Sequence, residues 1–473
     1  MRAGRRAHPL DRHGPSGPPD PPRPIPLHTG RPRMHSRGMD IAIEQSLTSM
    51  GDWQEDLYKD VHRHPELSMQ EERTAGRIES ELAQLGLETR RFGGTGVVAV
   101  IENGQGPTVL ARADIDALPV TEDEIVDYRP ETEGVMHACG HDFHLSALLG
   151  AVRALVENRE DWSGTYVAVF QPGEEEADGA LSMLRDGLAE AVPRPDVALG
   201  QHVMPGIAGQ VAITDGPVLS QGDSVHVTLH GRGAHGSMPH LAVDPVVLAS
   251  SIVLRLQQIV SREIPPGAFS VVTVGALNAG TKSNVIPATA ELRLNLRHYD
   301  PDVRDEVIAA LERIVRAECA ASGCTREPDV EYYDQYPLTS NDPEQEQIVR
   351  AAFEEAFDDG QVITMAPATA SEDFSHLPDA FGAPYVYWTV GGTDPDLYRR
   401  AQADGTVASE VPANHQSAFV PELHPTLEAM TRAQVAAALA YLGNVASEHP
   451  DSGTPEQSSS DTSDRAAGAA ARD

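Results

Sequence analysis

The sequence predicts an α/β protein in which a doubly wound, mostly parallel sheet forms the larger domain and a ferredoxin-like α+β domain is inserted into it. Short apolar runs alternate with helical segments before residue 200 and again near the C-terminus, which is typical of a buried parallel sheet covered on both faces. From about residue 220 the pattern changes to strict apolar–polar alternation, which indicates a sheet with one face in water. Because the first pattern returns after the second, the larger domain is expected to be discontinuous.

The larger domain is predicted to begin with helices and to continue with three buried strands. Helical periodicity covers much of residues 40–87 and then residues 145–156. The apolar runs 108–111, 166–170 and 197–199 each lead into a cluster of polar residues. Ligands of such sheets bind beyond the carboxyl ends of the strands, so these polar clusters are expected to meet at one edge.

The inserted domain is predicted from the element order β-α-β-β-α-β, which is that of a ferredoxin-like sandwich. Its expected elements span residues 225–229, 246–259, 271–274, 290–296, 303–321 and 329–333. The chain then returns to the larger domain with a helix, a strand and a terminal helix, at residues 344–356, 384–390 and 426–442. The expected domain limits are 39–219 and 334–445 for the two parts of the larger domain and 220–333 for the inserted one.

Length and composition narrow the classes of function. A chain of 473 residues favours two domains, and a formal net charge of −35 argues against a nucleic-acid partner, because phosphate would be repelled. No apolar run approaches the ~18 residues of a membrane span, so no membrane partner is expected. Three cysteines make no disulfide framework, which favours the cytoplasm. Residues 1–38 and 446–473 have the composition of disordered ends.

Candidate chemistry appears first at residues 137–144, His-Ala-Cys-Gly-His-Asp-Phe-His. Cys139 and His141 offer a thiolate and an imidazole, the side chains that bind Zn²⁺ and similar ions best. Gly140 between them allows the backbone to turn so that both can point into one volume. The helical period that follows places the cluster on a loop at a helix N-terminus. A chance grouping of histidines beside a buried cysteine is the alternative.

Four more candidates follow other strands or lie on a late loop: Glu174, Glu175, His202 and His415. Two metal ions need about six to eight ligand contacts with one ligand shared. Such a pair would lower the pKa of a shared water to ~7 and polarise a carbonyl, while a nearby carboxylate would serve as general base. The adjacent glutamates could divide these roles, and a solvated acidic turn over residues 174–176 is the alternative.

The order of several motifs resembles that of the aminoacylase/carboxypeptidase family of dinuclear metallohydrolases, in the branch of hippurate hydrolases and auxin-conjugate amidohydrolases. The resemblance covers about residues 50–443. It rests on Arg112-Ala-Asp-Ile-Asp-Ala-Leu-Pro119, Met136-His-Ala-Cys-Gly-His-Asp142, Phe170-Gln-Pro-Gly-Glu-Glu175, Gly231-Arg-Gly-Ala-His235, Asn284-Val-Ile-Pro287 and Ser371-Glu-Asp-Phe374. It implies a catalytic domain, which is the larger one, and an inserted lid and dimerisation domain.

The resemblance also implies a role for each matching residue. The implied metal ligands are Cys139 as the bridge, His141 and His202 at one ion, and Glu175 and His415 at the other. Glu174 would be the general base, and Asp116 would support a ligand. The implied cofactor is a pair of divalent metal ions, zinc first, with manganese, cobalt or nickel as alternatives. His137 and His144 are expected to pack beside the site rather than to bind metal.

The inserted domain is implied to contribute to the site as well. His235 matches a lid histidine that reaches the partner subunit's active site and stabilises the oxyanion, so a homodimer is expected. Asn284 and Arg297 are candidates for substrate binding, although a solvated position on the sheet is an equal alternative for Arg297. The chain has His415-Gln416-Ser417 where the branch has His-Ser-Pro, which puts the geometry of the last ligand in doubt.

These observations favour a metal-dependent amidohydrolase that cleaves the amide bond of N-acyl or N-aroyl amino acids. Two alternatives stay open. The same site could act on dipeptides or small peptides, as a metallopeptidase. The chain could also be an inactive relative that serves as a dimeric binding module, which the absence of stoichiometric metal would indicate.

Overall fold

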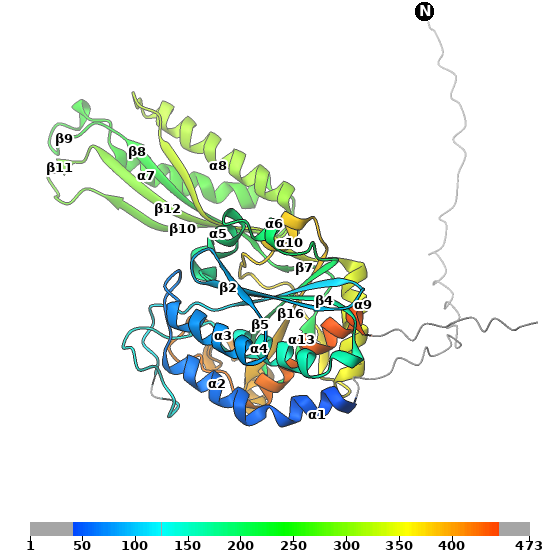
Figure 1. The fold of residues 1–473 in the computed structure, drawn as a ribbon. Helices are drawn as coiled ribbons and strands as arrows, with labels where there is room; N and C mark the ends of the chain where they lie inside the picture. The colour runs from blue at the N-terminus through cyan, green and yellow to red at the C-terminus, as the bar shows by residue number, and fades with distance from the viewer. Residues whose placement is uncertain (1–40, 124, 444–473) are drawn as a thin grey trace, which may run out of the picture. The chain divides into compact units, whose positions relative to one another are not determined.

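The computed structural model describes residues 41–123 and 125–443 of the chain. The two ends expected to be disordered, 1–38 and 446–473, lie outside these residues. Figure 1 shows one large sheet with helices on both faces and a second, smaller sheet with two helices. Within the described ranges, none of the helices combines the length and the apolar character that a bilayer crossing requires.

The large sheet has eight strands in the order β1-β2-β4-β3-β5-β16-β6-β15. The four central strands, β4, β3, β5 and β16, run parallel, whereas β1, β2 and β6 pair with antiparallel neighbours. This confirms the α/β class with a mostly parallel sheet. The strands are β1 Thr89–Phe92, β2 Gly96–Asn103, β3 Thr108–Asp114, β4 Gly164–Gln171, β5 Val197–Ile207, β6 Val211–Ile213, β15 Val362–Thr364 and β16 Tyr385–Thr393.

Helices cover both faces of this sheet because alternate strand residues point to opposite sides. Ala111 and Trp388 face a core shared with α2, α3, α4 and α13, whereas Leu110 and Tyr387 face a second core with α5 and α10 (Figure 1). The helices of the larger domain are α1 Ile41–Ser49, α2 Gly51–Arg63, α3 Glu72–Gln84, α4 His141–Glu157, α5 Gly179–Arg185, α6 Leu188–Ala191, α9 Pro343–Ala356, α10 His376–Phe381, α11 Pro395–Asp404, α12 Val407–Glu410 and α13 Leu423–Leu442.

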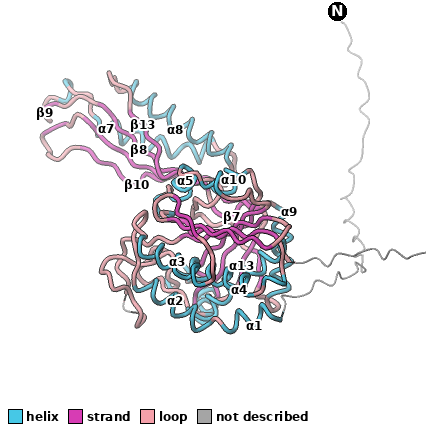
Figure 2. The backbone as a smooth tube through the Cα atoms, viewed as in Figure 1, coloured by secondary structure: helices cyan, strands magenta, loops and turns pink. Residues whose placement is uncertain are grey.

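The small sheet follows the predicted βαββαβ order and is antiparallel throughout, with strand order β10-β12-β8-β13 (Figure 2). Val225, Val227 and Leu229 of β8 are fully buried against the helices, and the residues between them are partly exposed, as the alternation predicted. The elements are β8 Gln221–His230, α7 Pro245–Gln258, β10 Ser270–Ala279, β12 Thr289–His298, α8 Pro301–Ala321 and β13 Asp329–Tyr336. Two short pairs, β9 Ala234–His235 with β11 Val285–Ile286 and β7 Gly216–Leu219 with β14 Thr339–Asn341, complete the strands.

Several helices start at an Asp-Pro pair, for a shared physical reason. In α7 the Asp244 side chain accepts hydrogen bonds from the first free N–H groups, and Pro245 needs no N–H partner at the first helical position. The same arrangement starts α8 at Asp300 and α9 at Asp342. These caps fix the first residues of α7, α8 and α9.

Candidate active site

Cys139 and His141 point into the same volume because Gly140 between them adopts a left-handed turn that leaves no room for a side chain. Gly140 has φ +84°, and a side-chain carbon there would lie 2.3 Å from a Val203 methyl group. Helix α4 starts directly after this turn, at His141, which is earlier than the apolar period predicted. The thiol and the imidazole therefore lie at a helix N-terminus, as expected.

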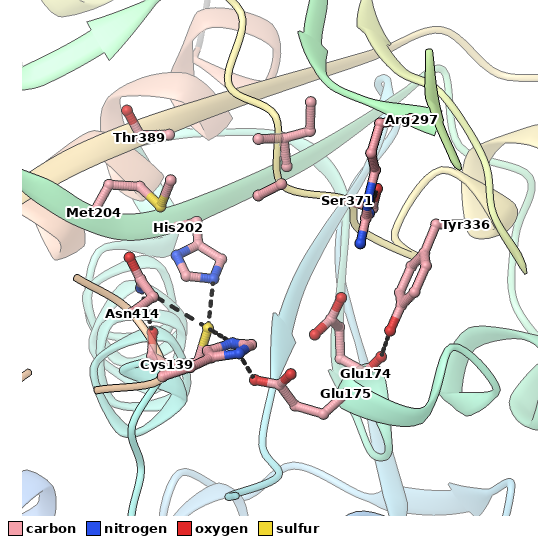
Figure 3. A pocket seen from close by; sticks show the side chains of 13 residues that line it. Cys139, Glu174, Glu175, His202, Met204, Arg297, Tyr336, Ser371, Thr389 and Asn414 are labelled. Carbon is pink, nitrogen blue, oxygen red and sulfur yellow. Dashed lines mark hydrogen bonds and ion pairs between the residues drawn. The ribbon is translucent and has the colours of Figure 1, made fainter. Parts of the chain in front are cut away.

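The remaining candidate ligands surround the Cys139 thiol (Figure 3). The distance from Cys139 Sγ is 3.4 Å to His202 Nε2 and 3.3 Å to His415 Nε2. His415 Nε2 in turn lies 3.2 Å from Glu175 Oε1. The ligand atoms of Cys139, His141 and Glu175 all lie within 4.8 Å of one another. The fold thus brings together all five side chains, from segments up to 276 residues apart.

One expectation about these residues is wrong in detail. His202 was expected beyond the end of a short strand, but β5 continues to Ile207 and holds His202 inside it. The strand is longer because β16 pairs with it past the apolar run, with Thr389 opposite His202. His202 therefore has a fixed backbone position, which a loop residue would lack.

The hydrogen bonds of His141 and His202 leave the lone pair of each Nε2 atom free to face the cluster. His202 Nδ1 donates to the Val203 carbonyl at 2.7 Å, and His141 Nδ1 donates to Asp116 Oδ1 at 3.0 Å, so each Nε2 is unprotonated when the ring is neutral. His141 Nε2 and Glu175 Oε1 are buried without a hydrogen-bond partner among the described residues. Orphaned buried polar atoms are costly, so their convergence fits a bound cation.

The charge around His141 supports the same conclusion. Burial lowers the pKa of the His141 imidazole, but the carboxylates of Asp114, Asp116 and Glu175 outweigh burial and raise it to about 10. The side chain thus lies in an excess of negative charge, which a divalent ion would neutralise better than a single proton. The residues present therefore fit a metal site.

His144 lies beside the cluster, in a group with Asp114, His141 and His202 whose ligand atoms all lie within 4.8 Å of one another, and its own ring nitrogens form hydrogen bonds. Its Nδ1 faces an Asp114 oxygen, and its Nε2 accepts from the Val203 N–H at 2.9 Å. Both ring nitrogens are thus occupied. Asp116, expected to support a ligand, does so: besides His141 it accepts from Ser68 Oγ at 2.7 Å and from the Glu175 N–H at 3.0 Å.

Glu174 lines the same cavity as the clustered side chains. It follows Gly173, whose φ of +56° starts a short 3-10 turn, and its carboxyl lies within 4.8 Å of those of Glu372 and Asp373. Burial, with the nearby charges of Glu372 and Glu175, raises its pKa well above the usual value. A carboxyl with a raised pKa that lines a cavity can both take up and release a proton.

Arg112 begins one of the motifs that carry the family resemblance, but no local pattern indicated that its side chain is buried in an ion-pair network. It is 1% exposed and forms ion pairs with Asp114 at 2.8 Å, Glu372 at 2.9 Å and Asp373 at 3.1 Å. Tyr387 donates to Glu372 at 2.6 Å. This buried network links the carboxylate beside His141 to those beside Glu174. The only hint of this network in the sequence is that Arg112 and Glu372 both belong to motifs of the family resemblance.

A cavity of about 190 Å³ opens on the cluster. Its cationic side is formed by Arg297, whose guanidinium donates to Ser371 Oγ and, at 2.9 Å, to Asn295 Oδ1. Within the described part of the chain Arg297 forms no ion pair, and burial lowers its pKa. The lining residues are Cys139, Glu174, Glu175, His202, Met204, Leu219, Arg297, Tyr336, Ala370, Ser371, Thr389, Asn414 and His415.

His235 and Asn284 do not line this cavity. His235 is exposed in β9, with Nδ1 2.7 Å from Ser237 Oγ, and the Asn284 carbonyl accepts the N–H of Gly236. The two residues thus lie together at the β9–β11 pair. Their roles in a partner subunit's site stay a prediction.

Similar proteins show what this arrangement belongs to. N-acetyl-L-cysteine deacetylase of Bacillus subtilis is 36% identical over 72% of this chain and 80% of its own length. Thermostable carboxypeptidase 2 of Saccharolobus solfataricus is 34% identical over 75% of this chain and 90% of its own length. Hippurate hydrolase of Campylobacter jejuni is 33% identical over 73% of this chain and 90% of its own length. A solved dinuclear metal-binding peptidase of the M20 family from Bacillus subtilis superposes with a TM-score of 0.67 at 26% identity, covering 83% of this chain and 99% of that one.

The model of Peptidase family M20/M25/M40 matches residues 110–403, which include all of the candidate ligands except His415. The relatives are hydrolases of amide bonds and fall in the amidohydrolase branch that the motifs indicated. The chain therefore belongs to Peptidase family M20/M25/M40 and is an amide-bond hydrolase of that family.

Proposed function

We propose that this enzyme hydrolyses N-acyl or N-aroyl amino acids to a carboxylic acid and an amino acid. The observation that carries the proposal is one cavity with metal-ligand atoms and Glu174 on one side and an unpaired guanidinium, Arg297, on another. The site fits a substrate that combines an amide bond with a free carboxylate. The deacetylase and the hippurate hydrolase to which the chain is similar have names that fit this class.

Cys139, His141, His202, Glu175 and His415 would hold two divalent ions, zinc first because one ligand is a thiolate, with manganese, cobalt or nickel as alternatives. When bound, the ions supply Lewis-acid polarisation of the amide carbonyl and lower the pKa of a water. Asp116 keeps the His141 ring in the orientation and tautomer that ligation needs.

Glu174 is the general base. Its carboxylate takes the proton of the attacking water and returns it to the leaving nitrogen, which needs a group whose pKa lies closer to neutrality than that of an ordinary glutamate. Glu372 and Asp373 lie close enough to raise that pKa, and Arg112 holds both carboxylates in place.

Arg297 binds the substrate carboxylate. The guanidinium is held by Ser371 and Asn295 and has no carboxylate partner among the described residues, so its remaining N–H groups can donate to a ligand carboxylate. Asn284 and His235 would act in trans, His235 on the oxyanion of the partner subunit's substrate.

A homodimer through the inserted domain is part of the proposal. Exposed apolar side chains, Val247 and Leu254, are 63% and 73% exposed on one side of α7, and β10 is an edge strand of the small sheet. Apolar helix surface beside an open sheet edge is typical of an interface. We also propose a cytoplasmic location, since all three cysteines are free.

A substrate panel tests this function. The enzyme, with its metal content measured, is assayed on N-acetyl and N-benzoyl amino acids, on matched amides whose carboxylate is blocked, and on dipeptides. Turnover of the acylated amino acids, lost when the carboxylate is blocked, is expected. Turnover of dipeptides alone would replace the proposed class by small peptides, which the similarity to a carboxypeptidase favours. No turnover and no stoichiometric metal would indicate an inactive binding module.

A further inference from the structure

The cavity has a second, apolar wall that the proposed chemistry does not use. It is formed by Met204, Leu219, Ala370 and Thr389. Leu219 and Thr389 are 3% and 5% exposed, so they are fixed parts of the protein interior that border the cavity. Figure 3 shows Met204 and Thr389 on one side of the cavity and Arg297 and Tyr336 on the other, with Glu174 and Glu175 below Arg297.

The strand register places this wall directly beside the ligand cluster. Thr389 of β16 is the register partner of His202, and Met204 lies two residues beyond His202 on β5. Residues two apart on a strand, and register partners on neighbouring strands, point to the same face of the sheet. Met204 and Thr389 therefore flank the His202 imidazole, and their distance from the cluster is fixed by the backbone.

Thr389 adds apolar rather than polar surface. Its hydroxyl donates to Met365 Sδ at 3.5 Å and points away from His202 in Figure 3. A hydroxyl occupied in this way has no proton left for a ligand. Met204 is half-buried and unbranched, so it can adjust to ligands of different shape.

We propose that Met204, Leu219 and Thr389 form the subsite for the acyl group and select apolar acyl groups larger than acetyl. This rests on the proposed function. The scissile carbonyl must lie at the ligand cluster, and Arg297 takes the carboxylate on one side of it. The acyl chain leaves the carbonyl in the other direction, where Met204 and Thr389 lie across the cavity from Arg297 (Figure 3). Acetyl would leave that wall in contact with water, whereas a benzoyl or a linear chain of several carbons would cover it.

The test uses a series of acyl groups on the amino acid that the wild-type enzyme cleaves fastest. We expect kcat/KM for hexanoyl and benzoyl to exceed that for acetyl by about tenfold or more, the scale of apolar discrimination in such pockets. Met204→Phe shortens the subsite and is expected to lower the hexanoyl-to-acetyl ratio about tenfold. Met204→Ala lengthens it and is expected to raise the octanoyl-to-butanoyl ratio, in the opposite direction.

Met183→Ala is the matched control. Met183 is fully buried in the core next to α5 and does not line the cavity, so its loss lowers stability without changing either ratio. Leu219→Ala gives a second test if Met204→Phe does not fold, and is also expected to raise the octanoyl-to-butanoyl ratio. A wild-type enzyme that prefers acetyl, or variants that change all acyl groups by one factor, would overturn the subsite. In that case the proposed hydrolysis would still stand, whereas no turnover of any acylated amino acid would remove both.

Discussion

Two clusters of histidine and carboxylate meet at His141 and Asp142, which are neighbours in sequence, and they differ in what the ring nitrogens face. In the ligand cluster, the Cys139 thiol, the His202 and His415 rings and the Glu175 carboxylate converge on each other. In the second cluster, His62 Nδ1 lies 2.6 Å from Asp142 Oδ2 and His62 Nε2 2.9 Å from Glu122 Oε2. Asp142 directly follows the ligand His141 in sequence. The residue types are nearly the same, but the ring nitrogens face a thiol in the first cluster and carboxylates in the second.

This difference separates a metal site from an internal ion pair. Burial lowers the pKa of His202 well below the usual value, so its ring is neutral and can bind a cation. Burial acts on His62 too, but hydrogen bonds with Asp142 and Glu122 outweigh it and raise its pKa to about 9. His62 is thus a cation at neutral pH that is already paired. The clusters therefore differ at His202 and His415, whose Nε2 atoms face the Cys139 thiol, whereas both ring nitrogens of His62 face carboxylates.

Metal removal should give the largest effect and should act on the first cluster alone. Dialysis against a chelator is expected to reduce turnover of an acylated amino acid to background, and zinc or another divalent ion to restore it. It should also lower stability by ~3–4 kcal/mol relative to protein in metal at about 100 to 1,000 times Kd. Elemental analysis and thermal unfolding measure both. Full activity in protein without bound metal would show that the cluster is not a metal centre.

Glu174→Gln should give the next largest effect, on the rate only. The amide keeps the shape of the side chain but cannot take the proton of water, so kcat is expected to fall by ~10²- to 10⁴-fold with metal content unchanged. Glu175→Gln is the matched control, because the neighbouring residue lies in the ligand cluster and its change should lower metal content instead. Near-normal kcat in Glu174→Gln would remove Glu174 from the mechanism.

Patterns along the chain were sufficient for the fold class and for six candidate side chains, and the family resemblance selected the five that cluster around Cys139. Apolar periodicity reflects burial on one or both faces, so it predicted the doubly wound sheet and the βαββαβ domain. Strand β2 was missed although residues 97–101 are apolar, and the edge strands β6 and β15 have three residues each, too few to show a period. Cys139 and His141 could be found because two residue types that bind metal lie two positions apart around a glycine.

Contacts between distant segments could not be predicted. Arg112 and Glu372 are 260 residues apart, and no local pattern signals a buried ion pair of that separation. His62 shows the same limit: it is the penultimate residue of α2, but its two carboxylate partners lie elsewhere in the chain. Local periodicity predicts which faces are buried, and the fold alone decides which charges meet there.

Removal of the His62 cation should be the largest effect confined to stability. His62→Leu leaves Asp142 and Glu122 as buried carboxylates without a counter-charge, and is expected to destabilise the protein by ~3–5 kcal/mol. His64→Leu is the matched control, since the His64 side chain is 32% exposed and its pairs with Asp60 and Glu131 are worth less than ~1 kcal/mol. Denaturant unfolding measures both. Equal effects of the two variants would show that the His62 pairs contribute nothing specific.

The smallest effect is the dependence of stability on pH. An unfolded histidine has a pKa of about 6.5, whereas the pKa of folded His62 is about 9, so the folded state holds a proton that the unfolded state has lost between these values. The contribution of His62 is therefore complete below about pH 6.5 and is lost as pH rises through about 9, a fall of about 3 kcal/mol. Measurements should stop below about pH 10, where unfolded tyrosines ionise while burial keeps Tyr58 neutral. If the wild-type curve and the His62→Leu curve fall in parallel over this window, other groups cause the loss. A fall that is about 3 kcal/mol larger in the wild-type protein than in His62→Leu would show that a proton on His62 stabilises the second cluster.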